Sequence, residues 1–379
     1  MTWLLSGLGL STFFWLCGAA GLHLWPLRPI TNLAELALTP FSILAQMMFP
    51  AHEHHHSQGY YLARSLLGGF GSVAALWLVH EVARLLRALR ERPVDGKRRG
   101  VLAGLLLTPV LGTALYSVLL EPSWLKLRRY ELKIAGLPPE LDGLKLGHLS
   151  DSHFGPLVGL MHIRRAIAML NAEQPDLVLL TGDYVHQTPS AIPDGIAVLT
   201  ELKSRLGSLA VLGNHDHWEG TEACRAEFVR HGLPLIDNQR VFLSARGLSE
   251  QPVGPCLAIC GVGDLWEDSV DPEKALQDVP ADCPRLLLSH NPDVAELIPN
   301  RFPRLRFDLQ LSGHTHGGQV SFPGVGTPIV PSAYGPRYAG GLVQGPAWPV
   351  VVSRGVGLTV LPVRFRVPPE VGLITLRRG

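Results

Sequence analysis

The sequence of 379 residues is poor in charged residues and in cysteine. Asp, Glu, Lys and Arg make up 17% of it, below the ~25% that is common in soluble domains. The deficit is local, because residues 1–27 and 101–120 contain none of these four residue types. Five cysteines are too few for a disulfide-dense secreted scaffold of this length. A net charge of +1 gives no general attraction for nucleic acid, so we expect no nucleic-acid partner.

Long apolar runs, of which 61–79 contains Arg64 near one end, predict a transmembrane helical region of three or four spans over residues 1–120. A helix needs ~20 apolar residues to cross a bilayer, and three runs reach that length: 3–27, 61–79 and 101–120. A fourth segment, 31–50, is apolar but contains Glu35 and Pro40, which fits either a span or a helix at the membrane surface. A cleaved signal peptide is the alternative for the first run, although no basic segment precedes it.

Basic residues predict which side of the membrane the rest of the chain occupies. Seven Lys or Arg residues lie within 81–100, and four follow the last run, at 126–133. Cytoplasmic loops are enriched in Lys and Arg. We therefore expect the 81–100 loop in the cytoplasm and the C-terminal domain, residues 121–379, on the extracytoplasmic side. A cytoplasmic domain is the alternative.

Residues 121–379 have ordinary globular composition and repeat one pattern. Short apolar runs of four to six residues predict strands buried on both faces. Helical periodicity follows the early runs, at 163–172, 197–206 and 221–231. Alternating strands and helices predict an α/β layered domain, which binds its ligands at strand ends. Later apolar runs at 350–352 and 372–376 predict closing strands of a second sheet.

Five motifs at predicted strand ends carry the side chains that bind metal ions. They are Asp151-Ser152-His153, Gly182-Asp183, Gly213-Asn214-His215-Asp216, Ser289-His290 and Gly313-His314-Thr315-His316. Asp, Asn and His are ligands suited to Mn, Zn or Fe. Taken singly, Asp151 or Asp183 is explained equally well by a turn. Two imidazoles at i and i+2, as at His314 and His316, are rarely used for packing, so the five motifs together predict a metal site.

Such a site can hydrolyse phosphate esters. Two metal ions ~3.5–4 Å apart are a recurring apparatus for this reaction. Because the two cations repel, they need a shared anionic ligand, for which we select Asp183. Metals held in this way lower the pKa of a bridging water toward neutrality, and the resulting hydroxide attacks phosphorus. The leaving oxygen needs a proton, which His215 or Asp216 is placed to donate, and His is the better acid near neutral pH.

The ordered motifs resemble those of the calcineurin-like metallophosphoesterase superfamily. The extended motif at 313–319, with Ser353-Arg354-Gly355 and Pro368-Pro369-Glu370, is most similar to its membrane-anchored bacterial branch. The resemblance covers about residues 125–379. It implies a four-layer α/β/β/α sandwich with two divalent metal ions. It also implies a metal-dependent phosphoric ester hydrolase in the bacterial inner membrane.

Position by position, the resemblance implies which side chains hold each metal. One metal would be held by Asp151, His153, Asp183 and His316. The other would be held by Asp183, Asn214, His290 and His314. His215 would contact the phosphate and assist the leaving group. Members of this branch often have one membrane anchor, whereas this sequence predicts several spans. The side of the membrane on which the domain lies, and its access to lipid substrates, therefore stay open.

The sequence leaves the substrate and two rival functions open. A phosphomonoester, phosphodiester or diphosphate fits the motifs, and the predicted spans favour a lipid-linked one. One rival is a membrane metal-binding or transport-associated protein with a non-catalytic domain, suggested by Glu35 and by the run His52-Glu53-His54-His55-His56. A solvated polar loop also explains that run, and a binding module does not need a proton donor such as His215. The other rival is an exported phosphatase that lacks residues 1–27.

Several polar residues near the motifs have structural interpretations. His148 is expected to pack within its strand, whereas His186 and His217 either line the cleft or only lie near it. Arg354 fits a phosphate clamp and a surface salt bridge equally well.

The cysteines of the globular part also have a structural interpretation. Cys256 and Cys260 have roughly the spacing of a metal knuckle, but they lie in an apolar strand-like run, which predicts buried free thiols. One disulfide remains an alternative.

Overall fold

The computed structural model describes residues 105, 108–109 and 111–379, and Pro109–Gly379 form one compact unit. The predicted spans at 3–27, 31–50 and 61–79 lie outside the described residues, as do the loop at 81–100 and the histidine run at 52–56. In the described part, no helix combines the length and hydrophobicity that a bilayer span requires. The described end of the 101–120 run is helical and finishes in a π-helical turn at Tyr116–Leu120.

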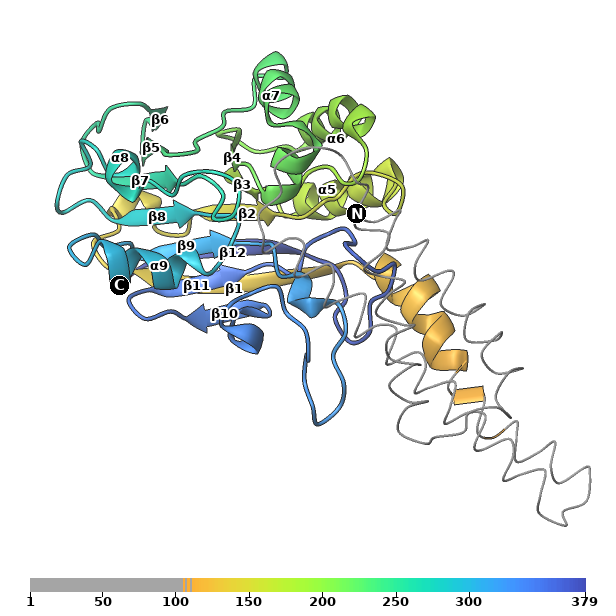
Figure 1. The fold of residues 1–379 in the computed structure, drawn as a ribbon. Coiled ribbons are helices and arrows are strands. Elements are labelled where there is room, and N and C mark those ends of the chain that lie inside the picture. The colour runs from red at the N-terminus through yellow and green to blue at the C-terminus, as the bar shows by residue number, and fades with distance from the viewer. Residues whose placement is uncertain (1–104, 106–107, 110) are drawn as a thin grey trace, which may run out of the picture. The chain divides into compact units, whose positions relative to one another are not determined.

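Five strands form the first sheet, in the order β1-β12-β2-β3-β4 (Figure 1). Their bounds are β1 Lys126–Ile134, β12 Glu370–Arg378, β2 Lys145–Leu149, β3 Leu177–Thr181 and β4 Ser208–Val211. Strands β2, β3 and β4 are parallel, and β12 lies antiparallel to β2 and parallel to β1. The expectation that 372–376 closes the second sheet is therefore wrong. A short apolar run specifies burial on both faces but does not specify its neighbours.

Seven strands form the second sheet, in the order β10-β11-β9-β8-β7-β5-β6. Their bounds are β5 Gln239–Ser244, β6 Gly247–Ser249, β7 Cys256–Gly261, β8 Arg285–Leu288, β9 Leu309–Ser312, β10 Gly341–Gln344 and β11 Pro349–Val352. The four central strands β7, β8, β9 and β11 are parallel, with antiparallel strands outside them. The run at 350–352 was predicted to lie in this sheet, and it does.

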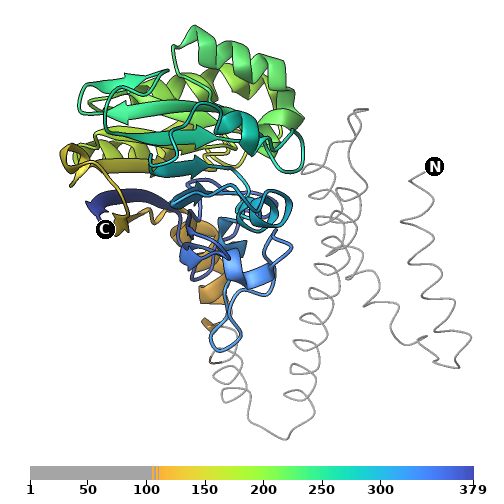
Figure 2. The same cartoon turned by 90° about the vertical axis from the view of Figure 1, so that its left-hand side faces the viewer.

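Successive side chains of each central strand pack into different hydrophobic cores, one on each face of the sheet. The domain is therefore built in layers (Figure 2). In β3, Leu177 and Leu179 pack between the two sheets, whereas Val178 and Leu180 pack under helices. In β8, Leu286 and Leu288 pack between the sheets, and Leu287 packs on the outer side. Each fully buried leucine stabilises the fold by roughly 1.5–3 kcal/mol.

Helices cover both outer faces, so the layers are helix, sheet, sheet and helix. The first sheet is covered by α5 Leu160–Ala172, α6 Ile192–Ala197 and α7 Asn214–Arg230. The second sheet is covered by α8 Pro272–Ala275 and α9 Val294–Arg301. The predicted α/β layered architecture is confirmed.

Two of the three predicted helices are present, and the third is wrong. Residues 163–172 lie in α5, and most of 221–231 lies in α7. Helix α6, in contrast, ends at Ala197, and only a 3₁₀ turn follows at Val198–Glu201. Pro193 occupies the first turn of α6, a position that proline favours, so the helix begins earlier than the apolar spacing suggested.

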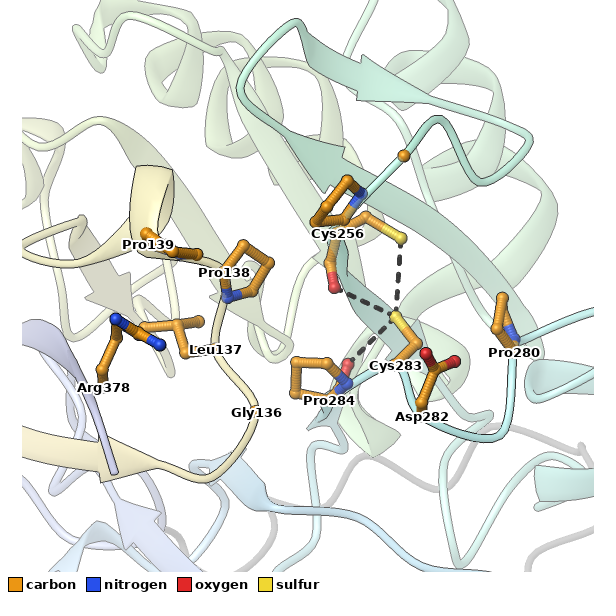
Figure 3. A pocket seen from close by; sticks show the side chains of 12 residues that line it. Gly136, Leu137, Pro138, Pro139, Cys256, Pro280, Asp282, Cys283, Pro284 and Arg378 are labelled. Atoms are coloured by element: carbon orange, nitrogen blue, oxygen red, sulfur yellow. Dashed lines mark hydrogen bonds between the residues drawn. The ribbon is translucent and has the colours of Figure 1, made fainter.

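Two cysteines face each other where strands β7 and β8 begin (Figure 3). The register pairs Ala258 with Arg285, and two residues earlier the Sγ atoms of Cys256 and Cys283 lie 3.5 Å apart. Both thiols are buried and free, and they line a pocket of about 380 Å³. Cys260 pairs with Leu287 in the register. The prediction of buried thiols is confirmed, and the thiol next to Cys256 is Cys283, not Cys260.

We predict that mild oxidation of the full chain joins Cys256 to Cys283. Neighbouring strands lie ~4.8 Å apart, within the Cα separation of ~4.4–6.8 Å that a disulfide allows. Burial raises the pKa of Cys283 to about 12, so cross-linking by oxidised glutathione should accelerate as the pH rises. Non-reducing mass spectrometry should find the linked peptides. Cys260→Ser should retain the link, and a peptide linking Cys256 to Cys260 would contradict the register.

Candidate metal centre

The five predicted motifs converge at the carboxyl ends of the parallel strands. Asp151, Asp183 and Asn214 come two or three residues after β2, β3 and β4, and His290 and His314 come two residues after β8 and β9. The carboxyl ends of parallel strands share one edge of a sheet, which is where open α/β sheets bind ligands. The two sheets face each other, so all five motifs reach one site.

The first cluster of polar atoms comes from three of these motifs. His153 Nε2 lies 2.9 Å from His316 Nε2. Asp151 Oδ1 lies 3.3 Å from His316 Nε2 and 4.0 Å from His153 Nε2. Asp183 Oδ2 completes the group, 3.4 Å from His153 Nε2. All four side chains are buried.

The second cluster lies on the other side of Asp183. His290 Nε2 is 3.1 Å from Asp183 Oδ2 and 3.2 Å from Asn214 Oδ1. His314 Nδ1 is 2.9 Å from Asn214 Oδ1 and 3.2 Å from His290 Nε2. The same oxygen atom, Asp183 Oδ2, therefore takes part in both clusters.

These atoms are suited to divalent metal ions. Imidazole nitrogens and carboxylate or amide oxygens are the donors that Mn, Zn and Fe accept. Asp151, His153 and His316 offer ligand atoms within 4.8 Å of one another, as do Asp183, His290 and His314. Asp151 Oδ2 is buried with no hydrogen-bond partner among the described residues, which is costly unless a cation or another donor compensates it.

Five side chains of the site extend from left-handed backbone. The φ angles are 53° at Asp151, 46° at His153, 58° at Asp183, 69° at His314 and 50° at His316. This conformation costs a residue that has a Cβ roughly 1–3 kcal/mol, and such residues cluster at functional sites. It turns the chain sharply off each strand, so that side chains close in sequence point to one place.

Asp216 fixes the turn that carries Asp183. Its Oδ2 accepts hydrogen bonds from the backbone N–H groups of Asp183 at 2.8 Å and Gly213 at 2.9 Å, and its Oδ1 accepts one from Tyr184 at 2.8 Å. Both oxygens are thus used by backbone amides in the buried interior. Asp216 was an alternative proton donor to His215, but its geometry gives it a positioning role instead.

His215 lies beside the first cluster and pairs with a second histidine. Its Nδ1 is 2.8 Å from His186 Nδ1, and its ring centroid is 4.8 Å from that of His153. Its backbone N–H donates to Asp183 Oδ1 at 2.8 Å. Burial, together with the neighbouring imidazoles, lowers the pKa of His215 well below its ordinary value. His186 therefore belongs to the site, and its position three residues after Asp183 was the available signal.

Three other polar residues near the motifs have local partners. His148 is buried and its Nε2 lies 2.8 Å from Thr181 Oγ1, which confirms the packed interpretation. His217 Nδ1 lies 3.1 Å from Thr221 Oγ1 within α7. Arg354 Nε lies 3.9 Å from Glu370 Oε2, which favours its salt-bridge alternative.

Sequence reasoning missed an aromatic wall beside the site. The ring of Trp266 lies 4.3 Å from that of His314, and the ring of Trp218 lies 4.5 Å from that of His215. The two indoles stack on each other at 6.4 Å.

The loop of Trp266 is held by Asp264, whose Oδ1 accepts hydrogen bonds from the N–H groups of Trp266 and Glu267. Burial raises the pKa of Asp264 to about 6. The pair Gly263-Asp264 after β7 repeats the Gly-Asp pattern of 182–183, and this repeat was the signal that was overlooked.

Comparison with known proteins finds phosphoesterases, in agreement with the motifs at the strand ends. Residues 144–318 match the family described as "Calcineurin-like phosphoesterase". The uncharacterized metallophosphoesterase YkuE of Bacillus subtilis is 33% identical over 69% of this chain and 89% of its own. Phosphodiesterase YaeI of Escherichia coli is 34% identical over 68% of this chain and 90% of its own. A "Transmembrane protein with metallophosphoesterase domain" of Danio rerio is 30% identical over 96% of this chain and 84% of its own.

We predict that Gly313→Ala weakens both the fold and metal binding. A Cβ at this position would overlap Ser150 Oγ and Asp151 Oδ2, and overpacking of this kind costs roughly 1–3 kcal/mol of the free energy of unfolding. Denaturant unfolding and metal content by mass spectrometry test this. Gly159→Ala is the matched control, since a Cβ there meets open space, and it should change little. Equal behaviour of the two variants would show that the close approach at Gly313 is unimportant.

Proposed function

This chain belongs to the calcineurin-like phosphoesterase family and is a metal-dependent phosphoric ester hydrolase, and we propose that it is a membrane-anchored phosphodiesterase with a dinuclear metal centre. The observation that carries the proposal is the position of Asp183 Oδ2, which lies 3.4 Å from His153 Nε2 and 3.1 Å from His290 Nε2. A single carboxylate oxygen between two sets of histidine nitrogens is what two adjacent cations need.

We assign the ligands by these two sets. One metal ion is held by Asp151, His153, Asp183 and His316. The other is held by Asp183, Asn214, His290 and His314. Each set then combines nitrogen and oxygen donors, and Mn, Zn and Fe all fit such a set.

When bound, the metal ions supply an acidified water as nucleophile and positive charge that offsets the charge of the phosphate. The protein supplies the geometry. Asp216 holds the Asp183 turn through three backbone amides, so the shared carboxylate keeps its position. The Trp218–Trp266 wall covers the side of the site next to His215 and His314, and we assign the leaving group to that side.

His215 is assigned to the leaving oxygen. Because His186 occupies its Nδ1, Nε2 is the nitrogen that reaches the phosphate. Burial keeps the imidazole neutral in the free protein, since its pKa lies well below the ordinary value. An anionic phosphate brought beside it raises that pKa. The imidazole therefore takes up a proton from water when the substrate binds, and this proton passes to the leaving oxygen as the P–O bond breaks.

The relatives and the sequence support the finer points of the proposal. The Escherichia coli relative is named a phosphodiesterase, which favours a diester over a monoester or diphosphate. The Danio rerio relative is named a transmembrane protein and aligns with nearly the whole chain, in agreement with the charge-free runs before residue 121. We propose a single anchored catalytic unit, residues 121–379, on the extracytoplasmic side, acting on a lipid-linked phosphodiester.

We predict that Asp183→Asn destroys the paired site. The amide is neutral and cannot screen two cations, so the protein should retain at most one metal ion where the parent retains two. Mass-spectrometric metal analysis after dialysis measures this ratio, and hydrolysis of bis-p-nitrophenyl phosphate should fall with it. Two retained ions in the variant would rule out the bridging role.

We predict that His215→Ala binds metal like the parent but hydrolyses a phosphodiester with an alkoxide leaving group ~10²–10⁴-fold more slowly, because it lacks the proton donor. Hydrolysis of bis-p-nitrophenyl phosphate, whose nitrophenolate leaving group needs no proton, should slow much less. His217→Ala is the matched control in the same helix and should keep nearly full activity. Tight binding of metal without any hydrolysis by the parent protein would instead favour the non-catalytic metal-binding alternative.

A chelator provides a third test. Incubation with EDTA should abolish hydrolysis, and added Mn should restore it. The free energy of unfolding should fall with removal of the metal, because the buried Asp151 and Asp183 carboxylates then lose their counter-charge. Unchanged activity in the metal-free protein would contradict the proposed chemistry.

A further inference from the structure

One end of the catalytic unit exposes large apolar side chains from two separate segments. The first segment is the end of the 111–120 helix and the residues after it, where Leu119 and Trp124 are exposed. The second is the loop that follows the last metal motif, where Phe322, Val325 and Ile329 are exposed. Val325 is 74% exposed and Leu119 is 61% exposed, so neither segment packs in the cores. We call these five residues the apolar edge.

The two segments are held together by a third one. The backbone N–H of Arg364 donates to Ser117 O at 2.9 Å, and that of Ser321 donates to Phe365 O at 2.9 Å. The rings of Phe322 and Phe365 lie 6.2 Å apart. Residues 364–365 thus bond the helix on one side and the loop on the other. Figures 1 and 2 show the loop and the helix projecting from the same end of the unit.

Two runs of sequence that reach the apolar edge lack charge. Residues 309–336 contain no Asp, Glu, Lys or Arg, and neither do 101–120. Glu121, between Leu119 and Trp124, is buried. Basic residues border the edge: the exposed Arg366 follows Phe365, and Lys126 Nζ lies 3.8 Å from the centre of the Trp124 ring. Exposed apolar patches bordered by polar residues mark protein or membrane contacts. Tryptophan next to lysine is typical of the level at which lipid headgroups meet the acyl chains.

We propose that the apolar edge lies in the surface of a lipid bilayer, with the tip of the 320–334 loop inserted below the headgroups. A bilayer is favoured over a protein partner because the charge-free run 101–120, long enough to cross one, ends at this same edge. The choice of lipid rests on the proposed membrane anchoring. The loop begins directly after His316 and Gln319, so insertion brings the metal motif close to the headgroup phosphates.

A depth measurement tests the proposal without using activity. The full chain carrying Val325→Cys is labelled with an environment-sensitive fluorophore and reconstituted into phosphatidylcholine vesicles with brominated acyl chains. The four described native cysteines are buried and Cys17 is replaced in all variants (Cys17→Ser), so the introduced thiol reacts first. Val229→Cys, on α7 and 80% exposed, is the matched control, and Ile329→Cys is a second position on the loop.

Bromine should quench the labels at 325 and 329 several-fold more than the label at 229. Equal quenching at all three positions would overturn the proposal. A second outcome would also overturn it. If the label at 325 is shielded from water both in detergent and in vesicles but is not quenched by bromine, a segment of the chain itself covers the edge. Hydrolysis of soluble bis-p-nitrophenyl phosphate is measured in parallel, so a failure of the proposed function is seen separately.

Discussion

The structure depends on the placement of one carboxylate, that of Asp183, between two clusters of histidine. Its Oδ2 lies within 3.4 Å of nitrogens from both sides, and its Oδ1 accepts the backbone N–H of His215. Both oxygens are therefore occupied, and the side chain has little freedom to rotate. A buried carboxylate without counter-charge is costly, so the surrounding fold has to hold it in place, and three devices do so.

The first device is Asp216, which binds the amides of Asp183, Tyr184 and Gly213 and so joins the ends of β3 and β4. The second is the left-handed backbone at five of the site residues, which aims the side chains at a cost in local conformation. The third is the close approach of Gly213 to the Asp183 carboxylate, which a larger residue would prevent. Hydrogen bonds to charged groups, worth about 1.5–3 kcal/mol each, offset much of the conformational cost.

The sequence predicted which side chains meet at the strand ends better than it predicted their surroundings. The seven proposed ligands were selected because each follows a buried strand, and the ends of parallel strands meet in space. Asp264 and Trp266 were missed because the loop after β7 carries only a Gly-Asp pair. Asp216 was considered only as the alternative proton donor to His215, and its positioning role was not predicted because its hydrogen-bond partners are backbone amides, which the sequence does not reveal.

Sheet membership also lay beyond the sequence. The run at 372–376 is apolar enough for either sheet, and only the partners of β12 decide between them. The helix expected at 197–206 failed for a related reason. Apolar spacing there serves the core contacts of Val198 and Leu199 in a 3₁₀ turn.

Arg364 connects features that are distant along the chain. Its guanidinium is fully buried, donates to the carbonyls of Arg354, Gly355, Gly357 and Val367, and lies 3.4 Å from His316 Nδ1. Its own amide holds Ser117, at the point where the polypeptide enters the catalytic unit. Arg364 therefore links this entry point directly to His316, one of the proposed metal ligands.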